Sequence, residues 1–397
     1  MFSLSRLFHA NRPAASPARH RPVVGLDIGS SAIKVAEIKR SGKQWQLLHC
    51  GMQPLAPDAV IDGHIKQPEL VTQAIKEVLA SSGITTQQTA ISLSGTSVIT
   101  KKIQMTRMTE LDLEEQIALE AEEYIPFDID DVHLDFQILS QQEESMEVLL
   151  TACKKEVIHN HTEVIRQAGL QPQVCDLDLF CLVNAYTAFV GPLEKTVSLQ
   201  QPAERKTTLP KASARTHDQP METVVLVNLG ATFLNIAMVT SQGLPGYIRD
   251  HALGCRQLIQ EIQSRYDLSW AAAEQRLIMP EQENPRHSAS TDLRNEAINP
   301  FLEQVVQQIR QAISFHKTGT QEQPITAVCL SGGGALLANA APFISEQLEL
   351  PVQTATFANL THPRSRGKPG SGSASLIQQM APRFMVALGL ALRGDMP

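Results

Sequence analysis

Three short glycine turns follow apolar segments of the chain, and their residue types suit phosphate binding. They are DIGSS (27–31), NLGAT (228–232) and SGGGA (331–335). Backbone N–H groups that point inward from a tight turn bind a phosphate well, and a side chain at the turn would block its approach. Serine and threonine hydroxyls add further donors. The first two turns therefore predict two phosphate-binding hairpins, with the candidate residues Gly29, Ser30, Ser31, Gly230, Ala231 and Thr232.

The third turn contains Gly332, Gly333 and Gly334 and precedes an apolar segment. We expect this turn to open a helix and to lie against the nucleoside of a bound nucleotide, with the helix N-terminus nearby. Glycine turns after strands are common, so each turn alone says little. The alternative is that these are three unrelated hairpin turns, but their order and separation favour one shared site.

Charged residues flank these turns. Lys34, in the strand after the first turn, could reach a phosphate as a point charge, or it could be a solvated strand lysine. Asp27 directly precedes the turn, where a carboxylate can hold Mg²⁺ through water molecules; the alternative is an aspartate that caps the turn. Asp176 and Asp178 could position a water molecule, although an acidic pair at the end of a strand is the simpler interpretation.

Two similar units must hold these residues. From residue 23 to 95 the pattern predicts three strands, a helix over 67–83 ended by Gly83, and a fourth strand. A Rossmann unit would instead pass from its glycine turn directly into a long helix. The segment TVVLVNLGATFLNIAMVTSQG begins the same strand, glycine turn, strand pattern again. The repeat predicts an α/β protein with two actin-like lobes that close around a nucleotide.

The residue pattern changes over 98–170, and this segment predicts a small inserted α/β subdomain. Thr109 is expected to cap a helix that runs to Tyr124 and is stopped by Pro126. After the insert, DLDLF (176–180) is expected to be a strand. The predicted organisation is a basic tail (1–22), a first lobe (23–97 and 171–191), the insert, a flexible linker (192–221) and a second lobe (222–397) with its own insert at about 253–322.

Composition argues against several classes of protein. The 397 residues carry 34 basic and 41 acidic side chains, which argues against broad binding of nucleic acid through phosphates. No run of 18 or more apolar residues is present, so no membrane-spanning helix is expected. The six cysteines include no CxxC pair, which does not suggest a zinc site or a disulfide framework and fits a reducing cytoplasm.

The first 22 residues carry four arginines and no acid. They predict either a disordered basic tail or a segment whose Phe2, Leu4, Leu7 and Phe8 enter a membrane surface while the arginines contact anionic lipids. A secretory signal is not expected, because Arg6 interrupts the short apolar part.

Six segments between residues 23 and 393 share their order with landmarks of one protein family. They are GLDIGSSAIKVAEI, EEYIPFDIDDVHLDFQIL, VNLGATFLNIAMV, LGCRQLIQEIQSRY, LSGGGA and VALGLALR. In these the chain resembles the PilM family of type IV pilus assembly proteins. The resemblance implies an FtsA-related, actin-like fold of two ribonuclease H-like lobes that binds ATP and Mg²⁺. It also implies a cytoplasmic protein at the bacterial inner membrane that binds the N-terminal cytoplasmic peptide of PilN and couples the PilN/PilO/PilP platform to the pilus motor components.

Two positions depart from the pattern of that family. Asn228 stands where the second phosphate turn usually begins with Asp, and a neutral amide is a poorer partner for a cation. We therefore expect ATP to bind and hydrolysis to be weak or absent. Leu253, Gly254 and Cys255 stand where the family usually has a Gly-Gly pair, which weakens the expected nucleotide contacts of Arg256.

Tyr124, Ile125, Pro126 and Phe127 are candidates for binding a partner peptide between the first lobe and the insert. Equally, they could form the core of the insert. The sequence leaves two other functions open. One is a nucleotide-independent adaptor of a pilus or secretion system, which Asn228 keeps open; the other is an actin-fold small-molecule kinase, for which the sequence offers no convincing general base.

Overall fold

The computed structural model describes residues 22–42, 44–96, 98–191, 222–240, 245–278, 294–319, 323–357, 359–361 and 379–394. The expected linker and nearly all of the expected basic tail lie outside these residues.

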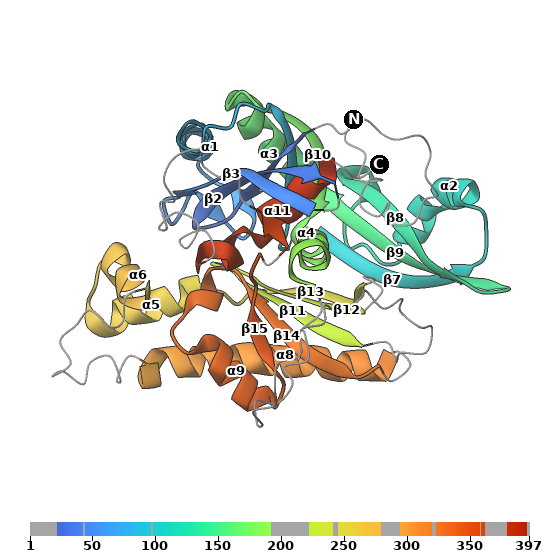
Figure 1. Ribbon diagram of the computed structural model, residues 1–397. Coiled ribbons are helices and arrows are strands. Elements are labelled where there is room, and N and C mark those ends of the chain that lie inside the picture. Colours follow the sequence, from blue (N-terminus) through green and yellow to red (C-terminus); the bar gives the residue numbers. More distant parts are fainter. Residues whose placement is uncertain are drawn as a thin grey trace, which may run out of the picture.

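Two mixed sheets form the centre of the molecule (Figure 1). The first has the order β10-β6-β1-β2-β3-β16, with β1 (Val24–Ile28), β2 (Ala32–Ser41), β3 (Gln44–Pro54), β6 (Gln88–Leu93), β10 (Gln171–Leu177) and β16 (Leu360–Thr361). The second has the order β13-β12-β11-β14-β15, with β11 (Thr223–Leu229), β12 (Leu234–Thr240), β13 (Pro245–His251), β14 (Ile325–Ser331) and β15 (Val352–Thr354).

The two sheets repeat one topology. In the first, β1, β2 and β3 form an antiparallel meander, and β6 and β10 follow in parallel on the other side of β1. In the second, β11, β12 and β13 form the meander, and β14 and β15 follow in parallel beside β11. This confirms the duplication that the two strand, glycine turn, strand segments predicted.

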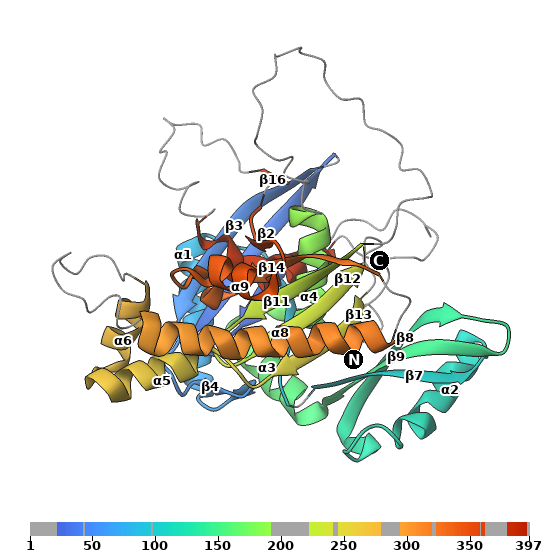
Figure 2. The same ribbon diagram turned by 90° about the horizontal axis from the view of Figure 1, so that it is seen from below.

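Helices separate and cover the sheets, so the molecule is layered (Figures 1 and 2). One face of the first sheet packs on α1 (Pro68–Ser82) and α3 (Lys155–Gln167). Between the sheets lie α4 (Asp178–Ala185) and α11 (Met385–Ala391), packed among apolar residues of both. The other face of the second sheet packs on α5 (Cys255–Tyr266), α6 (Trp270–Ile278), α8 (Asn299–Gly319) and α9 (Ala340–Leu348).

The remaining elements are short. They are the hairpin β4 (Val60–Ile61) and β5 (His64–Ile65), the 3₁₀ turns Ile129–Asp131, Gly333–Leu336, Ala381–Phe384 and Leu392–Gly394, and the π-helical turns Tyr186–Val190 and Arg294–Ile298.

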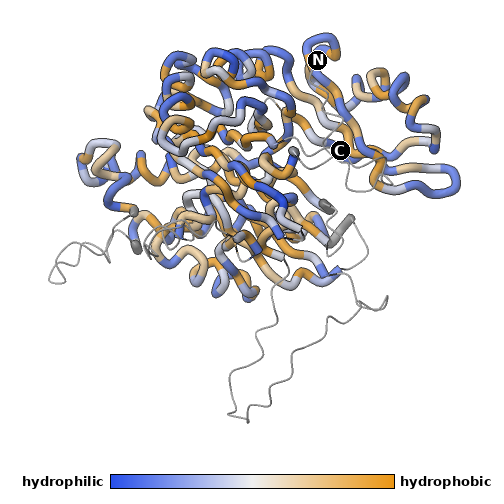
Figure 3. The backbone as a smooth tube through the Cα atoms, turned by 45° about the horizontal axis from the view of Figure 1, so that its top comes forward, coloured by the Kyte–Doolittle hydropathy of each residue, from blue (hydrophilic) through white to orange (hydrophobic). Residues whose placement is uncertain are grey.

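Alternation along the strands explains why two layers of helices can sandwich each sheet. In β11, Val225, Val227 and Leu229 join the core beneath α8, whereas Val224 and Leu226 face α4 and α11. Hydrophobic segments accordingly gather inside the molecule, and hydrophilic ones follow its outer loops (Figure 3). Among the described residues, no helix is both long and apolar enough to cross a bilayer.

The insert projects to one side as a separate small sheet (Figures 1 and 2). Its order is β7-β9-β8, with β7 (Val98–Thr106), β8 (Val132–Gln141) and β9 (Ser145–Lys154), and α2 (Glu110–Ala121) shares its core. Thr109 caps α2 as expected, in a reciprocal capping box with Asp112.

The helix α2 ends earlier than the sequence predicted, at Ala121 rather than Tyr124. Ile125 turns back into the core of the insert and is 5% exposed, whereas Tyr124 is 37% exposed. The carboxylates of Glu122 and Glu123 directly follow the last turn, where the helix dipole disfavours negative charge. This charge gives a physical reason for the early end.

Two further expectations about element boundaries were wrong. The strand β10 ends at Leu177, and Asp178 opens α4, so DLDLF is not one strand. The helix α3 was assigned to the insert, but its Val157, Ile158 and Ile165 pack in the core of the first lobe with α1. The packing therefore ends the insert at about β9.

The C-terminal residues return to the first sheet. The strand β16 pairs with β3, and α11 packs on β1 and α4, although both were expected to belong to the second lobe. Two glycines permit this close approach: a Cβ on Gly25 would lie 1.9 Å from the Ala387 carbonyl oxygen, and one on Gly389 would lie 2.0 Å from the Cys181 carbonyl oxygen.

Candidate functional site

One cleft between the lobes is lined by all twelve residues that the sequence singled out for nucleotide binding. They are Asp27, Gly29, Ser30, Ser31, Lys34, Asn228, Gly230, Ala231, Thr232, Gly332, Gly333 and Gly334. They come from the β1–β2 turn, the β11–β12 turn and the turn after β14. The duplicated topology therefore brings the two hairpins together from opposite sheets.

The two hairpin turns are built alike. The Gly29 N–H donates to the Ala32 carbonyl oxygen at 3.2 Å, and the Gly230 N–H donates to the Phe233 carbonyl oxygen at 2.9 Å. In each hairpin, the residue two positions before the turn glycine (Gly29 or Gly230) pairs with the residue five positions after that glycine. These pairs are Asp27 with Lys34 and Asn228 with Asn235.

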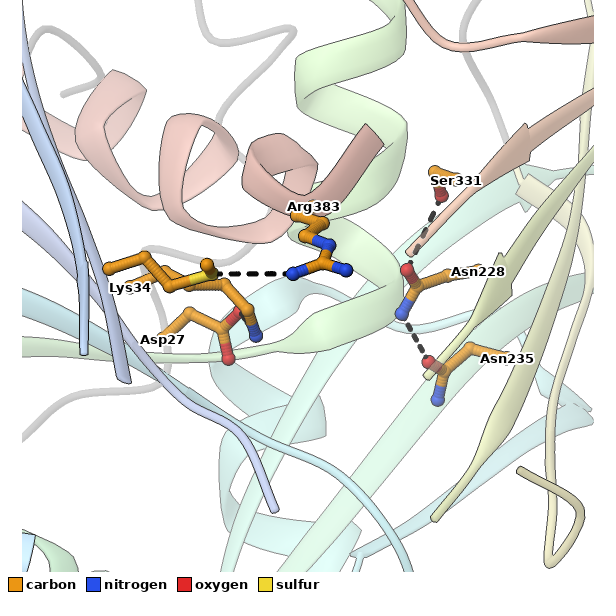
Figure 4. A network of polar contacts seen from close by, with 7 residues as sticks. Asp27, Lys34, Asn228, Asn235, Ser331 and Arg383 are labelled. Atoms are coloured by element: carbon orange, nitrogen blue, oxygen red, sulfur yellow. Dashed lines mark hydrogen bonds and ion pairs between the residues drawn. The ribbon is translucent and has the colours of Figure 1, made fainter. Parts of the chain in front are cut away.

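The paired side chains differ between the turns (Figure 4). Lys34 Nζ donates to Asp27 Oδ2 at 2.9 Å, and both side chains are largely buried. Asn228 Nδ2 donates to Asn235 Oδ1 at 2.7 Å. An ion pair in the first lobe thus corresponds to a neutral amide pair in the second.

A chain of hydrogen bonds extends from the amide pair across to the first lobe. Asn235 Nδ2 donates to Asp250 Oδ1 at 2.7 Å, and the Gly95 N–H donates to Asp250 Oδ2 at 3.1 Å. Burial raises the pKa of Asp250, and these two hydrogen bonds oppose that effect. At the other end, Ser331 Oγ lies 3.4 Å from Asn228 Oδ1. Both polar atoms of the Asn228 amide therefore have protein partners.

The third turn approaches the second at close range. Gly332 has φ of +83°, and a Cβ there would lie 2.4 Å from the Leu229 carbonyl oxygen. At Gly333 a Cβ would meet nothing within 4 Å, so this part of the turn has open space beside it. The glycines lead into the 3₁₀ turn Gly333–Leu336, and α9 begins only at Ala340. The expected helix N-terminus is therefore several residues away from the turn.

The helix α5 supports the second turn with its own backbone. The Cys255 N–H donates to the Gly230 carbonyl oxygen at 3.0 Å, and the Arg256 N–H donates to that of Ala231 at 2.8 Å. These N–H groups are thus engaged by the protein. The Arg256 side chain crosses the cleft, and its Nη2 donates to the Ser30 carbonyl oxygen at 3.3 Å.

The two acids considered for positioning water lie in different places. Asp176 is buried away from the cleft, where it accepts a hydrogen bond from Arg393 Nε at 2.6 Å. Asp178 lines the cleft. Burial raises the pKa of Asp178 to about 7, and the nearby Asp27 carboxylate adds to this effect. Only Asp178 is placed to act on a molecule in the cleft.

Unsatisfied donors in the cleft fit an anionic ligand. Thr232 Oγ1 and Arg383 Nε are buried and have no hydrogen-bond partner among the described residues. Arg383 points into the cleft between the Asp27–Lys34 pair and Asn228 (Figure 4). No local pattern in the sequence marks Arg383, whereas Asn235 could have been found by aligning the second repeat with the first, where Lys34 holds the equivalent position.

The same residues fit a tightly held Mg²⁺ poorly. Asp27 is engaged by Lys34, and Asn228 offers a neutral amide whose atoms have protein partners. Within the described part of the chain, no group of three or more His, Cys, Asp or Glu residues could hold a metal ion. Magnesium at Asp27 stays a prediction that these donors do not favour.

The four candidate partner-binding residues do not share one environment. Ile125 belongs to the core of the insert, and Phe127 packs against that core with Lys154 Nζ 4.2 Å from its ring centroid. Tyr124 and Pro126 are exposed. Ile125 and Phe127 therefore contribute to the core of the insert. Of the four candidates, only Tyr124 and Pro126 are exposed for contact with a partner.

Comparisons with known proteins agree with this architecture. A sequence model of the family described as "Type IV pilus assembly protein PilM" matches residues 25–395. A solved structure described as a PilM-PilN type IV pilus biogenesis complex is similar with a TM-score of 0.75 and 25% identity, covering 95% of this chain and 100% of that one.

A second solved structure supports the fold alone. It is the ethanolamine utilization protein EutJ from Carboxydothermus hydrogenoformans, with a TM-score of 0.52 and 13% identity over 95% of this chain and 91% of that chain. The fold is that of the actin-like ATPases. Because the family match extends over nearly the whole sequence, this chain belongs to the PilM family of type IV pilus assembly proteins.

Proposed function

We propose that this protein is an ATP-binding scaffold of type IV pilus assembly that binds the N-terminal cytoplasmic tail of PilN. Nucleotide binding is supported chiefly by the convergence of the three glycine turns on one cleft, where Thr232 and Arg383 offer unsatisfied donors. PilN binding is supported by family membership and by the similarity to the PilM–PilN complex.

The wider role follows from these two activities. The protein would lie at the cytoplasmic face of the inner membrane, held there by the PilN tail, and would couple the PilN/PilO/PilP platform to the pilus motor components. A nucleotide that bridges the lobes would set the affinity for the tail, and the coupling between the two sites would be reciprocal.

Thermal unfolding tests nucleotide binding directly. ATP at about 100 times its dissociation constant is expected to stabilise the folded protein by about 2.7 kcal/mol, which raises the melting temperature. An unchanged melting temperature at millimolar ATP would leave the nucleotide-independent adaptor as the function, an alternative that the neutral Asn228–Asn235 pair favours.

Peptide binding tests the partner and its coupling to ATP. A labelled PilN N-terminal peptide is expected to bind the full-length protein, with an affinity that changes when ATP is added. Tyr124→Ala is expected to weaken binding about tenfold, because an exposed tyrosine supplies contact area at low entropic cost. Leu119→Ala is the matched control, since Leu119 is also exposed, at 69%, on the neighbouring helix α2. Equal effects of the two variants would remove Tyr124 from the peptide site.

A further inference from the structure

The cleft contains a cation that the expected nucleotide contacts do not use. Arg383 lies in the 3₁₀ turn directly before α11, and its guanidinium lines the cleft between the two phosphate hairpins (Figure 4). Its Nη1 lies 4.0 Å from Met52 Sδ, and its buried Nε has no hydrogen-bond partner among the described residues. A guanidinium offers five donors, and sulfur is a weak acceptor, so the protein leaves this group poorly satisfied.

The position of Arg383 is fixed by the glycine turns themselves. The Gly332 N–H donates to the carbonyl oxygen of Pro382, the residue before Arg383, at 2.8 Å. Burial lowers the pKa of Arg383, and the Glu274 carboxylate, which also lines the cleft, opposes this effect. The side chain is therefore a charged group held at the turns by the backbone.

The acidic and amide side chains of the two phosphate hairpins are, by contrast, engaged or neutral. Lys34 compensates the Asp27 carboxylate, and the second turn carries two amides in place of a charged pair. Such a site has little to offer a divalent cation, while a polyphosphate entering it meets Lys34, Arg383 and the Thr232 hydroxyl.

We propose that the cleft binds nucleotide phosphates without a divalent cation, with Arg383 supplying the positive charge that a metal ion would otherwise bring. This inference rests on the proposed nucleotide binding. Arginine suits the task because its planar fork can bind two phosphate oxygens at once.

Calorimetric titration of the full-length protein with ATP, once with excess EDTA and once with MgCl₂, tests the inference. The two affinities of the wild-type protein are expected to agree within about threefold. Arg383→Gln is expected to weaken binding in EDTA by about 10- to 100-fold, and Arg383→Lys by less, because lysine keeps the charge without the fork.

Arg276→Gln is the matched control. Arg276 lies on α6 with its guanidinium 4.4 Å from the Tyr266 ring centroid and is not among the residues that line the cleft. The control removes the same charge and is expected to leave affinity unchanged. Melting curves without ligand show whether each variant is folded.

Three results would overturn the inference. The first is wild-type binding that requires Mg²⁺, and the second is an unchanged affinity of Arg383→Gln in EDTA; both leave nucleotide binding itself intact. The third, no binding under either condition, removes the proposed nucleotide site and the inference with it.

Discussion

At the scale of single residues, the two phosphate turns have the same strand register but pair different side chains. The first places Lys34 beside Asp27, and the second places Asn235 beside Asn228 at the equivalent register. Asn235 must present its amide nitrogen to the Asp250 carboxylate, so its oxygen faces Asn228. The hydrogen bond between Asn235 and Asp250 therefore constrains which side chain fits at position 228.

This dependence predicts that Asn228→Asp destabilises the protein. The carboxylate would face the Asn235 oxygen with no donor between them, at a cost of about 1–3 kcal/mol. Adding Asn235→Lys rebuilds the ion pair of the first turn and should recover most of the loss. Urea unfolding of both single variants and the double variant measures the coupling. Additive effects would contradict the proposed dependence.

Asp178 predicts a pH dependence of stability. Its pKa is held at about 7 in the folded protein by burial, whereas an unfolded aspartate titrates near pH 4. Between these values the folded state holds a proton that the unfolded state has released, so this residue makes stability fall as pH rises from about 4 to about 7.

Asp178→Asn is expected to remove this contribution. Unfolding by urea at pH 5 and pH 7.5 should show the wild-type protein losing about 2–4 kcal/mol more than the variant over this range. Glu346→Gln, which removes an exposed acid on α9, should retain the wild-type slope. Parallel pH profiles for the wild-type protein and Asp178→Asn would show that this carboxyl titrates normally.

At the scale of elements, the layer between the sheets depends on close backbone contact as well as on its apolar side chains. The helix α11 fits between β1 and α4 because Gly25 and Gly389 let the backbones approach. Any side chain at these positions forces the layers apart.

Gly389→Ala is therefore expected to cost about 3 kcal/mol of unfolding free energy, at the upper end of overpacking effects. Gly333→Ala is the control, because a Cβ there meets nothing within 4 Å, and its stability should be unchanged. Chemical denaturation of both variants makes the comparison. A tolerated Gly389→Ala would mean that α11 can shift without loss.

Local rules were enough to predict some elements and not others. Glycine turns, the Thr109 cap and the end of α1 at Gly83 depend on neighbouring residues, and all agree with the structure. The end of α2 and the packing of α3 depend on contacts far along the chain. Only tertiary contacts place Arg383 in the cleft. Nothing in its local sequence, APRF (381–384), indicates an arginine that lies near two distant hairpins.

At the scale of the whole molecule, hydrogen bonds join the lobes beside the cleft. Arg256 of the second lobe donates to the Ser30 carbonyl oxygen, and Asp250 accepts from the Gly95 N–H of the first. Both involve loops beside the cleft, so they are placed to report on its opening.

Arg256→Gln is expected to loosen the closed arrangement. Losing one hydrogen bond of roughly 1 kcal/mol should speed amide exchange in the β1–β2 turn about fivefold, and ATP should reverse the effect. Arg265→Gln, on the same helix and paired with Glu261 and Glu296, is the comparison. An unchanged rate of amide exchange in Arg256→Gln would mean that other contacts hold the lobes closed.

The return of α11 to the first sheet also bears on how the protein matures. The strands of that sheet up to β10 are synthesised long before α11, the helix that fills their inner face. Arg393, which compensates the buried Asp176, is synthesised 217 residues after it. The N-terminal lobe therefore cannot complete its core until α11 has left the ribosome, and until then it is exposed to chaperones and proteases.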